Sequence, residues 1–166
     1  MTTRSDAAAA TSDREMVVVR TIGGPRSLVF RAFSDAKHLA HWWGPNGFTT
    51  TTHQFAFRPG GVWDFIMHGP DGTDYPNYIE YREIVPPDRI VFIHGERADD
   101  PEAFISTITF VERDGETEVT MRALFKTKEL RDKVVKEYGA IEGGKQTLGR
   151  LATYVASLIG ETGNRA

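Results

Sequence analysis

His38 to Thr50 reads HLAHWWGPNGFTT, and in this stretch the chain changes from helical to extended. Two adjacent tryptophans run into Gly44 and Pro45, which together end a helix. Neighbouring side chains point in different directions in both helices and strands, so the two rings serve different surroundings. We expect Trp42 to be structural and Trp43 to lie at the mouth of a cavity. The alternative is that both rings are core and that the Gly-Pro pair is a plain turn.

Before this stretch, the sequence predicts one strand and two short helices. The run from Arg14 to Ile22 is rich in β-branched residues and ends at a Gly-Gly pair, which is typical of a strand. Pro25 suits the first position of a helix whose apolar face is Leu28, Val29, Ala32 and Phe33. Ser34 or Asp35 can cap a second short helix that runs through His41.

After the stretch, runs of apolar and β-branched residues alternate with turns rich in Gly, Pro and Asp, so we expect an antiparallel meander. The predicted strands are Phe48 to Phe57, Val62 to His68, Tyr75 to Val85, Arg89 to Gly95, Phe104 to Glu112 and Thr117 to Phe125.

The end of the chain changes to a helical period. Leu148, Leu151, Ala152, Val155, Leu158 and Ile159 recur in steps of three and four, as on one face of a helix. A sheet of this length must cover its apolar face, so the long helix is expected to lie across it. The sequence therefore predicts an α+β helix-grip fold: a curved antiparallel sheet of about seven strands around a long C-terminal helix, with two short helices after the first strand. We expect a disordered leader at residues 1–13, one domain at 14–160 and a flexible tail at 161–166.

Composition excludes several classes of function. The 166 residues carry a formal net charge of −3 and show no basic block, so no nucleic-acid partner is expected. No apolar run approaches the ~20 residues that span a bilayer, which argues against membrane insertion. The chain has no cysteine, so thiolate metal sites and cysteine nucleophiles are excluded, and a cytoplasmic location is expected.

Several stretches carry a resemblance to a known family. They are WWGPNGF, RPGGVWDFIMHGPDGTDYPN, EIVPPDRIV and EYGAIEGGKQTLGRLATYVA. From about Val17 to Leu158 the chain resembles the bacterial branch named after the activator of the heat-shock protein 90 ATPase, within the START-like, birch-pollen-allergen-like SRPBCC superfamily. The resemblance implies the helix-grip fold and a cavity between sheet and helix that accepts a hydrophobic small molecule. It does not imply a reaction, because one fold supports many functions.

Alternation along the strands then selects candidate ligand-binding residues. Trp63, Phe65 and Met67 share the bulky parity of their strand and are expected to face the helix. Leu148 and Leu151 would line the helix side, and Phe92 and His94 share the parity of Ile90. An ordinary packed core explains the same pattern.

For the strand YIEYREI, alternation alone does not show which face points inward. If Tyr78, Glu80 and Arg82 face the cavity, they bring a paired carboxylate and guanidinium to the ligand; the alternative is a solvated pair on the outer face. An enzyme of the cyclase or hydrolase type would use Glu80, Arg82 and His94. A chaperone-interaction module would instead need an exposed binding face.

No nucleophile elbow, phosphate loop, dinucleotide fingerprint or zinc-protease motif is present, so no catalytic residue and no cofactor is predicted, and an enzyme is the less favoured reading. His38 and His41 have a spacing usable for metal, but exposed helical histidines are the commoner explanation of that spacing, and we predict no metal site. The strand RIVFIHG is apolar on both faces, which indicates cover on both sides and favours a homodimer.

Overall fold

The computed structural model describes residues 12–165. The elements are a short 3-10 helix, η1 (Ser12–Arg14), seven strands and four α-helices. In chain order after η1 they are β1 (Glu15–Ile22), α2 (Arg26–Arg31), α3 (Ala36–Leu39), β2 (Thr49–Phe55), β3 (Val62–His68), β4 (Asp74–Val85), β5 (Arg89–Gly95), β6 (Phe104–Arg113), β7 (Glu116–Leu124), α4 (Lys128–Tyr138) and α5 (Ala140–Arg165).

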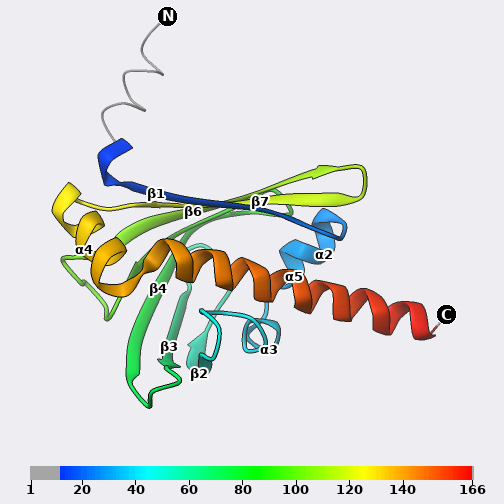
Figure 1. The fold of residues 1–166 in the computed structure, drawn as a ribbon, viewed down its shortest axis with the longest axis horizontal. Helices are drawn as coiled ribbons and strands as arrows, with labels where there is room; N and C mark the ends of the chain where they lie inside the picture. Colours follow the sequence, from blue (N-terminus) through cyan, green and yellow to red (C-terminus); the bar gives the residue numbers. More distant parts are fainter. Residues whose placement is uncertain (1–11, 166) are drawn as a thin grey trace, which may run out of the picture.

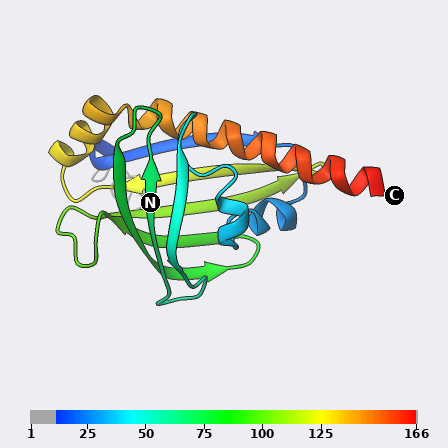
Figure 2. The same cartoon turned by 90° about the horizontal axis from the view of Figure 1, so that it is seen from below.

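All seven strands form one antiparallel sheet in the order β1-β7-β6-β5-β4-β3-β2. The sheet is strongly curved, and α5 runs across its concave side, with α2 and α3 near one end and α4 at the other (Figures 1 and 2). The predicted α+β helix-grip fold is confirmed, and each predicted strand lies within two residues of the observed limits. None of the helices in residues 12–165 is long and apolar enough to cross a membrane.

The two short helices begin within one residue of the predicted positions. Pro25 precedes α2 in an extended conformation, and the Asp35 carboxylate accepts the backbone N–H of Lys37 at the start of α3. Most of the predicted leader, 1–13, lies outside the described residues. The predicted tail, 161–166, coincides with the last turns of α5, apart from Ala166, which is not described. The domain limits at 14 and 160 stay a prediction.

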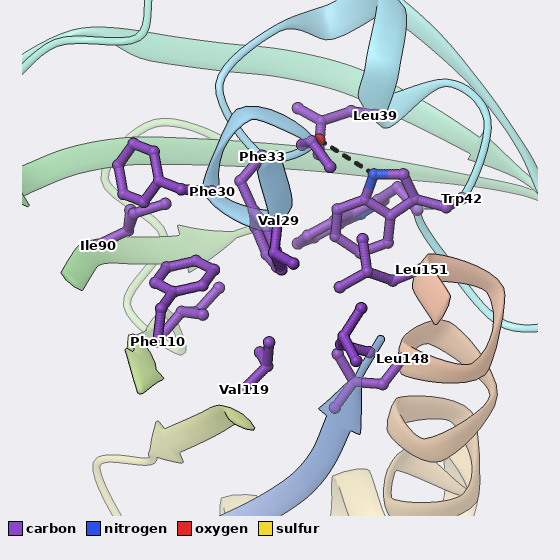
Figure 3. Packing of buried hydrophobic residues seen from close by; sticks show 14 of the residues in the cluster. Val29, Phe30, Phe33, Leu39, Trp42, Ile90, Phe110, Val119, Leu148 and Leu151 are labelled. Atoms are coloured by element: carbon purple, nitrogen blue, oxygen red, sulfur yellow. Dashed lines mark hydrogen bonds between the residues drawn. The ribbon is translucent and has the colours of Figure 1, made fainter. Parts of the chain in front are cut away.

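The core is packed solid at the end that α2 and α3 close. Phe33 contacts Trp42 and Phe110 edge to face, with ring centroids 4.6 and 5.2 Å apart. Leu148 and Leu151 of α5 fill the space opposite these rings (Figure 3) and are fully buried. The free volume of the fold therefore lies further along α5, toward α4.

Candidate functional site

A cavity of about 140 Å³ lies between the concave face of the sheet and α5. It takes side chains from four strands, the loop after α3 and the helix. Its lining is Met16, Val18, Trp43, Phe92, His94, Phe104, Ser106, Met121, Ala123 and Gly144. None of these side chains is a carboxylate, an ammonium or a guanidinium, so the cavity suits an uncharged, mainly apolar guest.

Small residues create this space. Ala123 and Ser106 are inward-facing neighbours on β7 and β6, where the packed end of the sheet carries Ile108, Phe110 and Val119. Opposite them, Gly144 lets α5 approach β1, because a Cβ there would stand 3.0 Å from Cγ2 of Val18. The glycine-rich start of α5 therefore packs closely against the sheet.

Trp43 forms one wall of the cavity. Its ring is 7% exposed and lies edge to face against Trp63 at 5.1 Å and Phe65 at 6.3 Å. The chain turns directly after it at Gly44, whose φ is +96° and whose Cβ, if present, would stand 2.7 Å from Cε of Met67. Trp43 is therefore a buried part of the cavity wall, which corrects its predicted place at the cavity mouth. Packing against Trp63 and Phe65 holds the ring away from solvent.

His94 is the principal polar group on the β5 side of the cavity. Its Nε2 lies 2.7 Å from Oδ1 of Asn77, and its ring is 4.9 Å from that of Phe104. Burial lowers the pKa of His94 to about 4, so the imidazole is neutral at pH 7. This histidine faces the interior, as the parity of β5 predicts.

A larger cleft adjoins the cavity at the α4 end of the molecule. It has a volume of about 370 Å³, and His94 and Phe104 line both spaces. The remaining lining mixes charged, polar and apolar residues: Asn77, Gly95, Glu96, Arg97, Asp100, Pro101, Glu102, Phe125, Leu130, Lys133, Val134 and Tyr138. His94 and Phe104 therefore stand between the cavity and this cleft.

The other predicted apolar site residues also face inward. Trp63 and Phe65 are stacked at 3.8 Å and buried, and Met67 is partly buried against the core. Leu148 and Leu151 are buried on the inward stripe of α5. None of these five lines the cavity itself; they form the packed layer beside it, and their part in binding stays a prediction.

Tyr78, Glu80 and Arg82 lie on the outer face of the sheet, which corrects the cavity placement that the sequence left open. Glu80 and Arg82 form an exposed ion pair at 3.2 Å. The inward residues of β4 are instead Ile79 and Tyr81, which are 1% and 3% exposed.

Pairing of Glu80 with outward Ile93 sets this face, and a bulge follows in β4. The register with β5 shifts between Tyr81 and Glu83, so Arg82 is an extra residue and Ile84 returns to the core side. Glu80 and Arg82 are thus on the opposite face from His94, and the three groups of the enzyme alternative are not brought together.

The paired histidines after Asp35 pack against α5. Nδ1 of His38 hydrogen-bonds the Tyr154 hydroxyl, and the His41 ring stacks on the Tyr154 ring at 5.0 Å. Among the described residues, no group of three or more His, Asp or Glu side chains is arranged to hold a metal ion.

Sequence reasoning missed seven of the lining residues: Met16, Val18, Phe104, Ser106, Met121, Ala123 and Gly144. For Ser106 a signal was present. It shares the inward parity of Ile108 and Phe110, so a polar residue stands where alternation places the core.

Comparison with known proteins identifies the family that the chain matches. The family model described as Activator of Hsp90 ATPase homolog 1-like protein matches residues 24–156. No curated protein sequence matches the chain.

Solved structures of bacterial proteins share the fold. One from Arthrobacter aurescens has 22% identity, covers 89% of this chain and 88% of its own, and has a TM-score of 0.81. One from Nitrosomonas europaea has 22% identity, coverage of 90% and 98%, and a TM-score of 0.81. One from Mycobacterium smegmatis has 25% identity, coverage of 86% and 91%, and a TM-score of 0.77.

Proposed function

The chain belongs to the family of Activator of Hsp90 ATPase homolog 1-like proteins, and on that basis we propose that it binds a small hydrophobic molecule between the sheet and α5. The observation that carries the proposal is the cavity of about 140 Å³ with its uncharged, largely apolar lining. Cavity walls that face empty space forfeit dispersion contacts, and an apolar guest restores them while leaving water.

The size of the cavity sets the size of the guest. An engineered apolar cavity of about 150 Å³ binds benzene, so a guest of one six-membered ring fits here. Larger guests would extend past His94 and Phe104 into the adjoining cleft. We place the route of entry there, because α4, which forms one side of the cleft, has no buried residue and so costs little to displace.

Toluene is the probe that tests this function. We expect it to bind the wild-type protein and to shift the methyl NMR signals of Met121 and Val18, which line the cavity. Ala123→Leu fills the cavity and should abolish those shifts. The matched control is Ala156→Leu, an exposed site on α5, which should leave them unchanged. A protein that shows no toluene-dependent shift does not have this function.

Two alternative functions, an enzyme and a chaperone-interaction module, can each be tested separately. Of Glu80, Arg82 and His94, the three candidates for an enzyme of the cyclase or hydrolase type, only His94 faces inward. Loss of turnover in His94→Gln would support this function. A chaperone-interaction module would bind through an outer surface, and retention of the chaperone in a pull-down would support it.

We also propose that the protein is a homodimer and that it is cytoplasmic. The outer face of the sheet carries exposed apolar side chains on β1 and β6: Val17, Val19, Ile105 and Val111. A second copy would remove them from water. The cytoplasmic location rests on the lack of cysteine.

A further inference from the structure

Ser106 is a buried polar residue in the cavity wall without a partner. Its side chain lines the cavity, and the residue is 5% exposed. Within residues 12–165, its hydroxyl makes no hydrogen bond. Leaving a buried hydroxyl unpaired costs free energy, so the group is available to a guest.

His94 offers a second unpaired position in the same wall. The side-chain nitrogen of Asn77 donates to the Tyr75 carbonyl at 2.9 Å, which turns Oδ1 of Asn77 toward His94. Nε2 of His94 must therefore carry the proton and donate to that oxygen. In a neutral imidazole the other nitrogen, Nδ1, is then an acceptor, and in the described part of the chain it has no partner.

Both unpaired atoms keep accessible surface. The buried side-chain atoms that are unpaired and fully sealed, among those described, are Arg26 Nε and Thr50 Oγ1. Oγ of Ser106 and Nδ1 of His94 are not in that group. Both residues line the cavity, and His94 also lines the adjoining cleft, so a guest in the cavity lies beside both side chains.

The sheet holds the two groups on one face of adjacent strands. His94 pairs with Phe104 across β5 and β6, and Ser106 lies two residues further along β6. Such diagonal neighbours are about 7–8 Å apart at the backbone and closer at their side chains. A hydroxyl that makes two hydrogen bonds can bridge the side-chain atoms when the two side chains lean together.

We propose that the ligand is a compact cyclic or aromatic alcohol whose hydroxyl donates to Nδ1 of His94 and accepts from the Ser106 hydroxyl. This inference rests on the proposed function and adds the chemical class. A hydroxyl is the smallest group that both donates and accepts, which is what these two atoms require. An acid or amine is disfavoured, because no opposite charge lines the cavity.

Comparing phenol with toluene isolates the hydroxyl. The two molecules have nearly the same shape, and a purely apolar cavity prefers toluene because phenol must give up hydrogen bonds to water. We therefore expect titration calorimetry on the wild-type protein to show phenol binding at least tenfold more tightly than toluene, the effect of one well-made hydrogen bond or more.

Variants then identify the partner. Ser106→Ala should weaken phenol about tenfold and leave toluene within twofold of wild type, while Ser27→Ala, an exposed serine on α2, should change neither. The comparison on the unchanged protein does not depend on the folding of any variant.

The outcomes separate the two proposals. Toluene binding as tightly as phenol, or Ser106→Ala weakening both ligands equally, overturns the alcohol inference while leaving the apolar-binding function in place. Binding of neither ligand overturns both.

Discussion

Trp42 and Trp43 are adjacent in the chain but lie in different surroundings. Trp42 has no exposed surface, and its indole N–H donates to the Ala32 carbonyl at 3.0 Å, the bond drawn in Figure 3. Trp43 packs on three aromatic rings but borders the cavity on its remaining side. One ring is thus part of the sealed core, and the other separates that core from the cavity.

Truncating the two rings should therefore have unequal effects. Trp42→Ala removes contacts on all sides and a buried hydrogen bond, so we expect a loss of ~3–5 kcal/mol in the free energy of unfolding. Trp43→Ala removes fewer contacts, should cost less, and should change toluene affinity because it enlarges the cavity. Urea denaturation and calorimetry measure the two effects. Equal destabilisation with unchanged toluene affinity would show that Trp43 is only core.

At the scale of elements, two side chains of α5, Arg150 and Gln146, hold the loop after α3 in place. Arg150 donates from Nη1 to the carbonyls of Trp43, Gly44 and Pro45 at 3.2, 2.9 and 3.1 Å. A chain that turns out of a helix leaves carbonyls without helical partners, and a guanidinium can satisfy several at once. The position of Trp43 in the cavity wall therefore depends on Arg150, which does not itself line the cavity.

Replacing Arg150 should loosen this loop. Arg150→Met keeps the apolar stem but removes hydrogen bonds from a charged donor, so we expect a loss of about 2 kcal/mol in urea denaturation. Arg150→Lys should recover only part of it, because an ammonium lacks the planar fork. Faster hydrogen exchange of the Asn46 amide, which bonds the Gln146 side chain, would localise the effect.

Lys145→Met is the control, since this residue is exposed on the same helix. A control variant as unstable as Arg150→Met would show that the loss reflects charge on α5 and not the carbonyl contacts.

At the scale of the whole molecule, the two faces of the sheet differ in cover. The concave face is packed by α2 and α5, whereas Val19 and Ile105 on the convex face are 53% and 45% exposed. Val91 and Ile93 of β5, on the same convex face, are half-buried by neighbouring strands. The apolar residues of β5 are thus buried on the concave side, where Ile90 and Phe92 are 1% and 3% exposed, and only half-buried on the convex side.

A homodimer through the convex face predicts a measurable mass. Light scattering at micromolar concentration should give twice the chain mass of 18.6 kDa. Val19→Lys places a charge in the proposed interface and should shift the protein to monomer, whereas Ile159→Lys, at an exposed site on α5, should not. A monomer mass for the wild-type protein would refute the dimer.

Strands and helices with a clear hydrophobic period could be predicted, because that pattern lies in residues close together in the sequence. Val62–His68 and Arg89–Gly95 have the predicted limits, since each run is bounded by turn residues. The inward face of β3 followed from alternation alone. In β4, alternation did not show which of the two faces points toward the core. The pairing with β5, including the bulge at Arg82, determines that face. No single strand carries that information.

The sequence by itself determined the order of the elements and the inward stripe of α5, because periodicity and turn chemistry act over a few residues. Only the tertiary structure decided where the cavity lies and which polar atoms face it. A cavity is the volume left over when distant side chains meet, here Met16 of β1, Ser106 of β6 and Gly144 of α5. Their meeting depends on strand register and on the position of the helix, which are properties of the whole packed chain.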